Sequence, residues 1–66
     1  MMWKDLNDIS HLSSETIKRT KNVCRSKEME GFETAVFPTV DGHVLIQIYG
    51  NDSDTEYIVN ENGNLI

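Results

Sequence analysis

The sequence predicts an α+β fold in which one short and one longer N-terminal helix precede a three- or four-stranded antiparallel β-meander. Three observations lead to this prediction. Apolar residues recur at helical spacing only in the first half of the chain, residues 44–49 (VLIQIY) are its longest β-prone run, and Asp41-Gly42 is a hairpin turn signal. Residues 1–66 are therefore expected to form a single small α+β domain.

Met2, Leu6 and Ile9 follow an i, i+4, i+7 pattern, which predicts a short amphipathic helix over residues 2–9. A helix of this length is not stable alone and must dock on the rest of the molecule. Trp3 lies beside its apolar stripe. We expect Trp3 to cap the core rather than to serve as an exposed anchor for a partner, because one tryptophan is a large share of the apolar surface here.

The main helix is predicted over residues 14–29. Ser13 is a good N-cap, Arg25 and Lys27 suit the negative end of the helix dipole, and Gly31 is a plausible stop. Its buried stripe is narrow, and the residues expected in it are Ile17, Thr20 and Cys24, flanked by Val23.

Strands are predicted over residues 32–39, 44–49 and 55–60, with 64–66 as a short terminal pairing. A turn centred on Asp41-Gly42 places Phe37 opposite Ile46, and a four-residue loop turns the nitrogen of Pro38 away from the partner strand. The core face is then expected to hold Ala35, Phe37, Thr39, Val44, Ile46 and Ile48, and the outer face Val36, Pro38, Leu45, Gln47 and Tyr49. The third strand is expected to set Tyr57 opposite Ile48 and Val59 opposite Ile46, which leaves Glu56 and Ile58 outside.

A chain of 66 residues buries only about 60% of its unfolded surface, so its core is small. The single cysteine, Cys24, excludes an internal disulfide, and no Cys/His set has the spacing of zinc ligands. The longest apolar run is too short for a membrane span, and the N-terminus has no basic-then-apolar leader. These features predict a cytoplasmic protein that has no metal or other cofactor and does not contact a membrane.

Catalytic candidates are few. His11 is expected in the interhelical connection, His43 at the hairpin tip, and Cys24 among small core residues. Residues 52–56 (DSDTE) begin like an EF-hand loop, but Tyr57 occupies the position that needs glycine and Gly63 the one that needs a bidentate glutamate. The sequence therefore predicts a protein that is not an enzyme.

The distribution of charge is the strongest functional signal in the sequence. The net charge is −5, and five of the six basic residues lie in the main helix, namely Lys18, Arg19, Lys21, Arg25 and Lys27. From Glu28 onward the chain has no Lys or Arg and eight carboxylates. The C-terminal part of the chain should therefore have a negative electrostatic field, which attracts basic protein surfaces and repels nucleic acid.

The leading hypothesis is a non-catalytic protein-binding module that covers a basic surface, such as a nucleic-acid-binding groove, on a larger protein. Small acidic inhibitors and antidotes of phages and mobile elements are an analogy of size and charge. The expected acidic contact residues are Glu33, Asp41, Asp52, Asp54, Glu56 and Glu61. An outer apolar face of Val36, Leu45, Tyr49 and Ile58 is expected to contribute to a partner contact.

Two alternatives remain open. Helix, turn, basic helix and hairpin is an order similar to a truncated winged helix-turn-helix, which implies a nucleic-acid-binding regulator that uses residues 18–27. The net charge opposes the phosphate contacts on which such binding depends. The other alternative is a homodimeric structural or accessory protein in which the basic helix, the acidic sheet or the strand edges of two copies meet.

Overall fold

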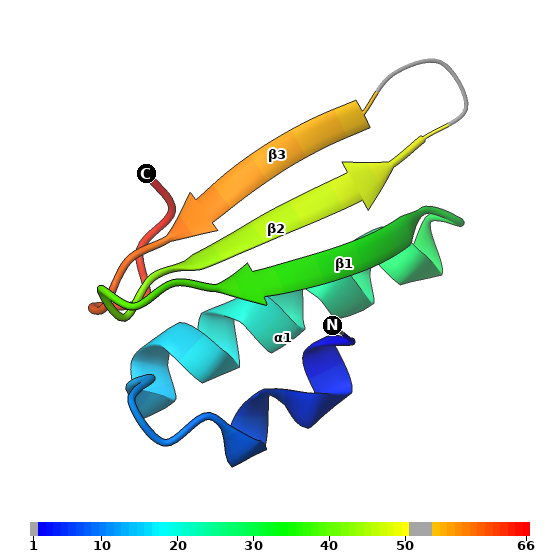
Figure 1. The fold of residues 1–66 in the computed structure, drawn as a ribbon. Coiled ribbons are helices and arrows are strands. Elements are labelled where there is room, and N and C mark those ends of the chain that lie inside the picture. The colour runs from blue at the N-terminus through cyan, green and yellow to red at the C-terminus, as the bar shows by residue number, and fades with distance from the viewer. Residues whose placement is uncertain (1, 51–53) are drawn as a thin grey trace.

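The computed structural model describes residues 2–50 and 54–66 and confirms the α+β class. A 3₁₀ helix, η1 (Trp3–Asp8), and an α-helix, α1 (Ser14–Met29), precede three strands, β1 (Glu33–Pro38), β2 (Val44–Tyr49) and β3 (Asp54–Val59). The strands form an antiparallel sheet in the order β1-β2-β3. Both helices lie against the same face of this sheet, so the fold has two layers (Figure 1).

Helix α1 begins and ends where its capping residues predict. The Ser13 side chain accepts a hydrogen bond from the Thr16 N–H at 3.1 Å, which satisfies one of the free donors of the first turn. The helix ends before Gly31, which has a φ of +96°. Its buried side chains are Thr16, Thr20 and Cys24, whereas Ile17 and Val23 are half-buried at the margin. The predicted stripe is therefore correct at Thr20 and Cys24 but shifted by one residue at its N-terminal end.

The short N-terminal helix predicted over residues 2–9 is present as a 3₁₀ helix. Its backbone bonds span three residues, from the Asp5 N–H to the Met2 carbonyl and from the Ile9 N–H to the Leu6 carbonyl. The element docks by burying Trp3 and Leu6. The indole Nε1 of Trp3 donates to Glu28 Oε2 at 2.7 Å, and the Thr34 hydroxyl donates to the same oxygen at 2.6 Å. Trp3 is thus part of the core, as expected.

The register of β1 on β2 differs by one residue from the prediction. Val36 lies opposite Ile46, and Pro38 lies opposite Val44. The connecting loop spans five residues, 39–43, because the Thr39 N–H bonds to the His43 carbonyl and the His43 N–H bonds to the Thr39 hydroxyl. Since side chains alternate along a strand, the shift moves Val36 into the core and leaves Ala35 and Phe37 on the outer face. The faces predicted for these three residues, and for Pro38, which shares the face of Val36, were wrong.

Pro38 fulfils its predicted role despite the changed register. The Thr39–His43 pair is hydrogen-bonded. Bonded and non-bonded pairs alternate in an antiparallel ladder, so Pro38 opposite Val44 belongs to a non-bonded pair, and its nitrogen faces away from β2.

The register of β3 on β2 differs by two residues, with Val59 opposite Val44 and Tyr57 opposite Ile46. A shift of two preserves the faces, so Val59 is still buried and Glu56 and Ile58 still lie outside. The predicted terminal strand is reduced to an isolated bridge between Leu65 and Val59, with a 2.8 Å bond from the Ile66 N–H to the Ile58 carbonyl.

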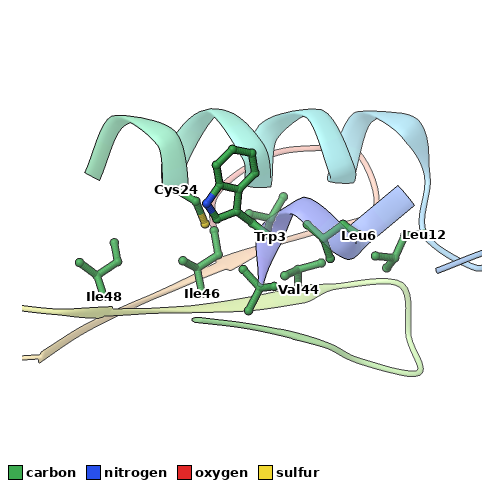
Figure 2. Close-up of a cluster of buried hydrophobic side chains, with 9 residues drawn as sticks. Trp3, Leu6, Leu12, Cys24, Val44, Ile46 and Ile48 are labelled. Atoms are coloured by element: carbon green, nitrogen blue, oxygen red, sulfur yellow. The ribbon is translucent and has the colours of Figure 1, made fainter. Parts of the chain in front are cut away.

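The core lies between the two layers (Figure 2). Ile46 and Val44 at its centre are fully buried, as are Leu6 and Cys24 above them. The cluster consists of Trp3, Leu6, Leu12, Cys24, Val36, Val44, Ile46, Ile48 and Val59. All its strand residues point to one side, so the apolar side chains on the opposite side of the sheet are not part of this core.

Gly63 and Gly31 provide a matched test of how the C-terminal turn packs on α1. Both have positive φ, but a Cβ on Gly63 would lie 2.8 Å from the Glu15 carbonyl oxygen, whereas a Cβ on Gly31 meets nothing within 4 Å. We expect Gly31→Ala to cost about 1–2 kcal/mol from its backbone conformation alone and Gly63→Ala to cost roughly 2 kcal/mol more. Urea unfolding measures both, and equal losses would contradict the packing described.

Glu28 should make stability depend on pH in the acid range. The hydrogen bond from Thr34 is the main cause that lowers the pKa of the Glu28 carboxyl, and the bond from Trp3 acts in the same direction. A carboxyl whose pKa is lower in the folded than in the unfolded chain stabilises the fold at pH values above its unfolded pKa. This contribution is lost as the pH falls through the lowered pKa of the folded chain. The Glu28→Gln variant should therefore be less stable than the parent at neutral pH, and the difference should shrink below about pH 4. Denaturant unfolding of both proteins across this pH range measures the difference in their free energies of unfolding. A difference that does not change with pH would contradict the stabilising role of the Glu28 carboxylate.

Candidate functional site: the open face of the sheet

The side of the sheet away from the helices carries nine side chains in a regular grid. Strand alternation and the two registers place them in three rows that run across the sheet. The rows are Phe37–Leu45–Ile58, Ala35–Gln47–Glu56 and Glu33–Tyr49–Asp54. Neither helix covers this side in the described residues (Figure 1). We call these nine residues the open face.

One end of the open face is apolar. Phe37 and Ile58 are 43% and 41% exposed and flank the half-buried Leu45. Ile66, which is 74% exposed, lies beside Ile58 through its backbone hydrogen bond and extends the same row. Isolated exposed apolar residues are common, whereas these residues form a contiguous row on an uncovered sheet face.

The other end is acidic and ordered by hydrogen bonds. The Tyr49 hydroxyl donates to Gln47 Oε1 at 2.6 Å, and Gln47 Nε2 donates to Glu56 Oε1 at 3.2 Å. Glu33 and Asp54 flank Tyr49, and all three carboxylates are exposed. In the described ranges 2–50 and 54–66, the ion pairs join Lys27 to Glu30 and His43 to Glu61, so neither neutralises the open face.

The predicted acidic residues thus divide into groups. Glu33, Asp54 and Glu56 come together on the open face, whereas Asp41 and Glu61 lie in the turns at the opposite end of the sheet. Asp52 lies outside the described residues. The five carboxylates that the structure describes do not form one surface.

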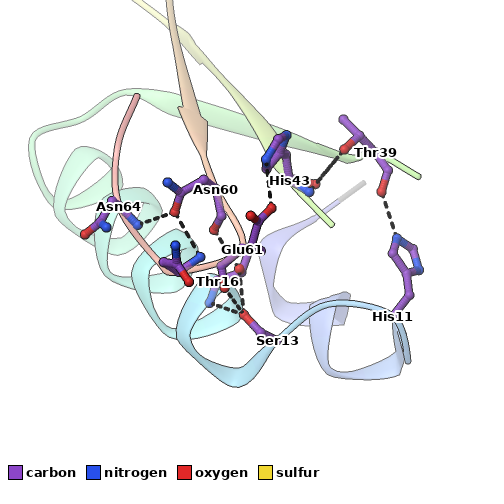
Figure 3. A network of polar contacts seen from close by, with 9 residues as sticks. His11, Ser13, Thr16, Thr39, His43, Asn60, Glu61 and Asn64 are labelled. Atoms are coloured by element: carbon purple, nitrogen blue, oxygen red, sulfur yellow. Dashed lines mark hydrogen bonds and ion pairs between the residues drawn. The ribbon is translucent and has the colours of Figure 1, made fainter. Parts of the chain in front are cut away.

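Glu61 belongs to a polar network that ties three connections together (Figure 3). Its carboxylate lies 3.1 Å from His43 Nε2, and its carbonyl accepts a 2.7 Å bond from the Ser13 hydroxyl. His11 Nε2 donates to the Thr39 carbonyl at 2.8 Å, and the Thr16 hydroxyl donates to the Asn60 carbonyl at 2.7 Å. This network has a structural role, because it fixes the hairpin and the C-terminal turn to the start of α1.

The outer apolar set was predicted correctly at three of its four positions. Leu45, Tyr49 and Ile58 lie on the open face. Val36 was assigned to it wrongly and is fully buried, because the five-residue loop reverses the parity of β1. Phe37 takes its place on the open face. The signal for this exchange was Thr39, whose side chain can bond the backbone two or more residues ahead and so lengthen a loop.

The basic residues lie in the opposite layer, where several have intramolecular contacts. Arg19 Nε donates to the Gly63 carbonyl at 3.0 Å, and the Arg25 guanidinium lies 5.8 Å from the Trp3 ring centroid. Lys27 lies 3.7 Å from Glu30. Lys18 is exposed and Lys21 half-buried on the same helix. Thr16 and Thr20 of α1 face the sheet, and several of its basic side chains are engaged within the molecule. The role of α1 that these contacts show is therefore structural.

In the described residues the Cys24 thiol lies near Glu28 and the Thr34 hydroxyl, but its burial raises the pKa of the thiol and makes it a poor nucleophile. No group of three or more His, Cys, Asp or Glu side chains in the described residues could hold a metal ion, and residues 52 and 53 of the EF-hand-like segment lie outside that part. A hollow between α1 and β3 is lined by Arg19, Asn22, Val23, Ser26, Lys27, Tyr57 and Leu65 and contains no nucleophile paired with a base. The open face remains the best-defined candidate site.

Comparison with protein-family models, curated proteins and solved structures found no match for this chain. Among the described residues, no helix has the length and apolarity needed to cross a membrane. The function is therefore argued from the geometry and charge of the open face.

Cys24 should be inert to thiol reagents in the native state. Burial is the main cause that raises the pKa of its thiol to about 11, so the reactive thiolate is scarce near neutral pH. We expect native protein at pH 8 to resist a maleimide and protein in urea to react at the rate of a free thiol. A mass spectrum taken during labelling measures both. Rapid native labelling would show that Cys24 is accessible.

Proposed function

We propose that this chain is a non-catalytic protein-binding module whose open face docks on a positively charged surface of another protein. The observation that supports the proposal most is an uncovered sheet face with an apolar row at one end and, at the other, three carboxylates that form no ion pair within the described part of the chain. Apolar contact supplies affinity, and the carboxylates supply charge complementarity and a faster association rate.

The charge balance of the two halves of the chain supports a cationic partner. Residues 1–32 carry six Lys or Arg and five carboxylates, whereas residues 33–66 carry six carboxylates and no Lys or Arg. The negative field of the molecule therefore originates in the sheet and its loops. Surfaces that bind nucleic-acid phosphates have the required opposite charge. We propose a nucleic-acid-binding protein as the class of partner, with the small acidic chain covering its basic groove.

A second copy of the chain fits the open face less well. If two open faces packed across a two-fold axis, the acidic end of one would meet either the acidic or the apolar end of the other. The first arrangement sets like charges together, and the second buries carboxylates without a partner at a cost of several kcal/mol. Both costs vanish when the facing surface carries Lys or Arg.

The proposal is tested by neutralising the open face without changing its shape. The variant Glu33→Gln, Asp54→Asn, Glu56→Gln removes three charges there, and the control Asp5→Asn, Asp8→Asn, Glu30→Gln removes three from the helical layer. At about 0.5 kcal/mol per exposed pair, the first variant should bind its partner roughly tenfold more weakly at low salt, and the control should bind like the parent.

Immobilised parent and variant chains are compared side by side for capture of proteins from host lysate at low and at high salt. A partner retained by the parent and the control, lost on the open-face variant and released by salt supports the proposal. Equal retention on all three chains would refute it. Retention that depends on nucleic acid and survives neutralisation of the open face would instead favour the basic helix.

A further inference from the structure

We propose that the partner places an amphipathic helix on the open face, with apolar residues at one end of that helix and Lys or Arg at the other. This inference rests on the proposed function and specifies the element that the open face receives. Three observations support it. They are the width of the open face, the interruption of both sheet edges, and the change from apolar to acidic side chains along the strands.

The dimensions of the open face suit one helix. Its three strands span two inter-strand spacings, about 10 Å, and their six residues extend about 20 Å. A helix with its side chains is about 10–12 Å across. On the covered face, α1 by itself contacts all three strands, and η1 adds contacts with β1 (Figure 1).

Addition of a partner strand to a sheet edge is less favourable than docking on the face. Pro38 removes a backbone donor from β1, which is one edge of the sheet. On the other edge, Leu65 and Ile66 already lie beside Val59 and Ile58. Each edge is therefore interrupted at the end where the apolar row lies, and a strand could not use that row.

The chemistry of the face changes along the strands rather than across them. The row Phe37–Leu45–Ile58 is four residues away from the row Glu33–Tyr49–Asp54, a distance of about 13 Å. A helix that follows the strands rises about 11 Å in two turns, roughly seven residues, and a lysine side chain reaches across the remaining distance of about 2 Å. Its apolar residues would contact the first row, and Lys or Arg about two turns further along the same stripe would reach the carboxylates of the second.

A designed peptide tests this spacing directly. The matched peptide carries two leucines one turn apart and two lysines on the same stripe about two turns further along, on a helix-forming alanine and glutamine background. The control peptide has the same composition, but its lysines are moved to the opposite side of the helix. Each is titrated into isotope-labelled protein at low salt while backbone amide shifts are followed.

We expect the matched peptide to shift the amides of Leu45, Tyr49 and Ile58 and to bind roughly fivefold more tightly than the control, since two exposed charge pairs supply this difference. The triply neutralised open-face variant should bind the two peptides equally. Equal binding of both peptides by the parent chain would overturn the inference.

Two further outcomes separate this inference from the proposed function. If neither peptide binds while the lysate partner still depends on Glu33, Asp54 and Glu56, the helix is wrong and the docking face stands. If the same amides shift with protein concentration in the absence of peptide, a second copy occupies the face and the inference of a foreign helix is overturned.

Discussion

The fold depends on the packing of α1 against the sheet through three small side chains, Thr16, Thr20 and Cys24. The two threonines can be buried because their hydroxyls bond the Asn60 carbonyl and the Thr16 carbonyl. One of these bonds stays within the helix, and the other fixes the turn that follows β3. A narrow stripe of this kind covers the middle of the sheet but leaves its margins to other elements, which is why η1 and its Trp3 are needed to complete the core.

One-sided coverage follows from this arrangement. The helices, the Trp3 indole and the polar network at the hairpin end all bind to the same side of the sheet or to its connections. The opposite side is left with Phe37, Leu45 and Ile58, and nothing in the described part of the chain packs over them. The feature that stabilises the small core therefore also creates the surface that we propose for docking.

Helix bounds and fold class could be predicted because they depend on local signals, such as the Ser13 cap and the positive φ of Gly31. Strand register could not. It depends on the length of a loop, and the side-chain bond that closes the loop at Thr39 adds one residue, which exchanges Val36 and Phe37 between faces. The register of β3 differs by two residues, and periodicity cannot detect a shift that preserves every face. The separation of Asp41 and Glu61 from the other described carboxylates could not be predicted for a related reason, because the turns lie at opposite ends of the strands.

If the open face docks on a basic partner as proposed, its acidic end acts on self-association as well as on binding. An uncovered apolar sheet face would normally be a route to aggregation, and charged side chains are the usual protection. Here Glu33, Asp54 and Glu56 are grouped beyond one end of the apolar row instead of being interspersed through it. Grouped charges oppose contact between two copies yet leave the apolar row intact, so the surface stays available to a partner that brings the opposite charge. Protection against aggregation alone would not require the carboxylates to be grouped. Their grouping makes one end of the face apolar and the other end acidic.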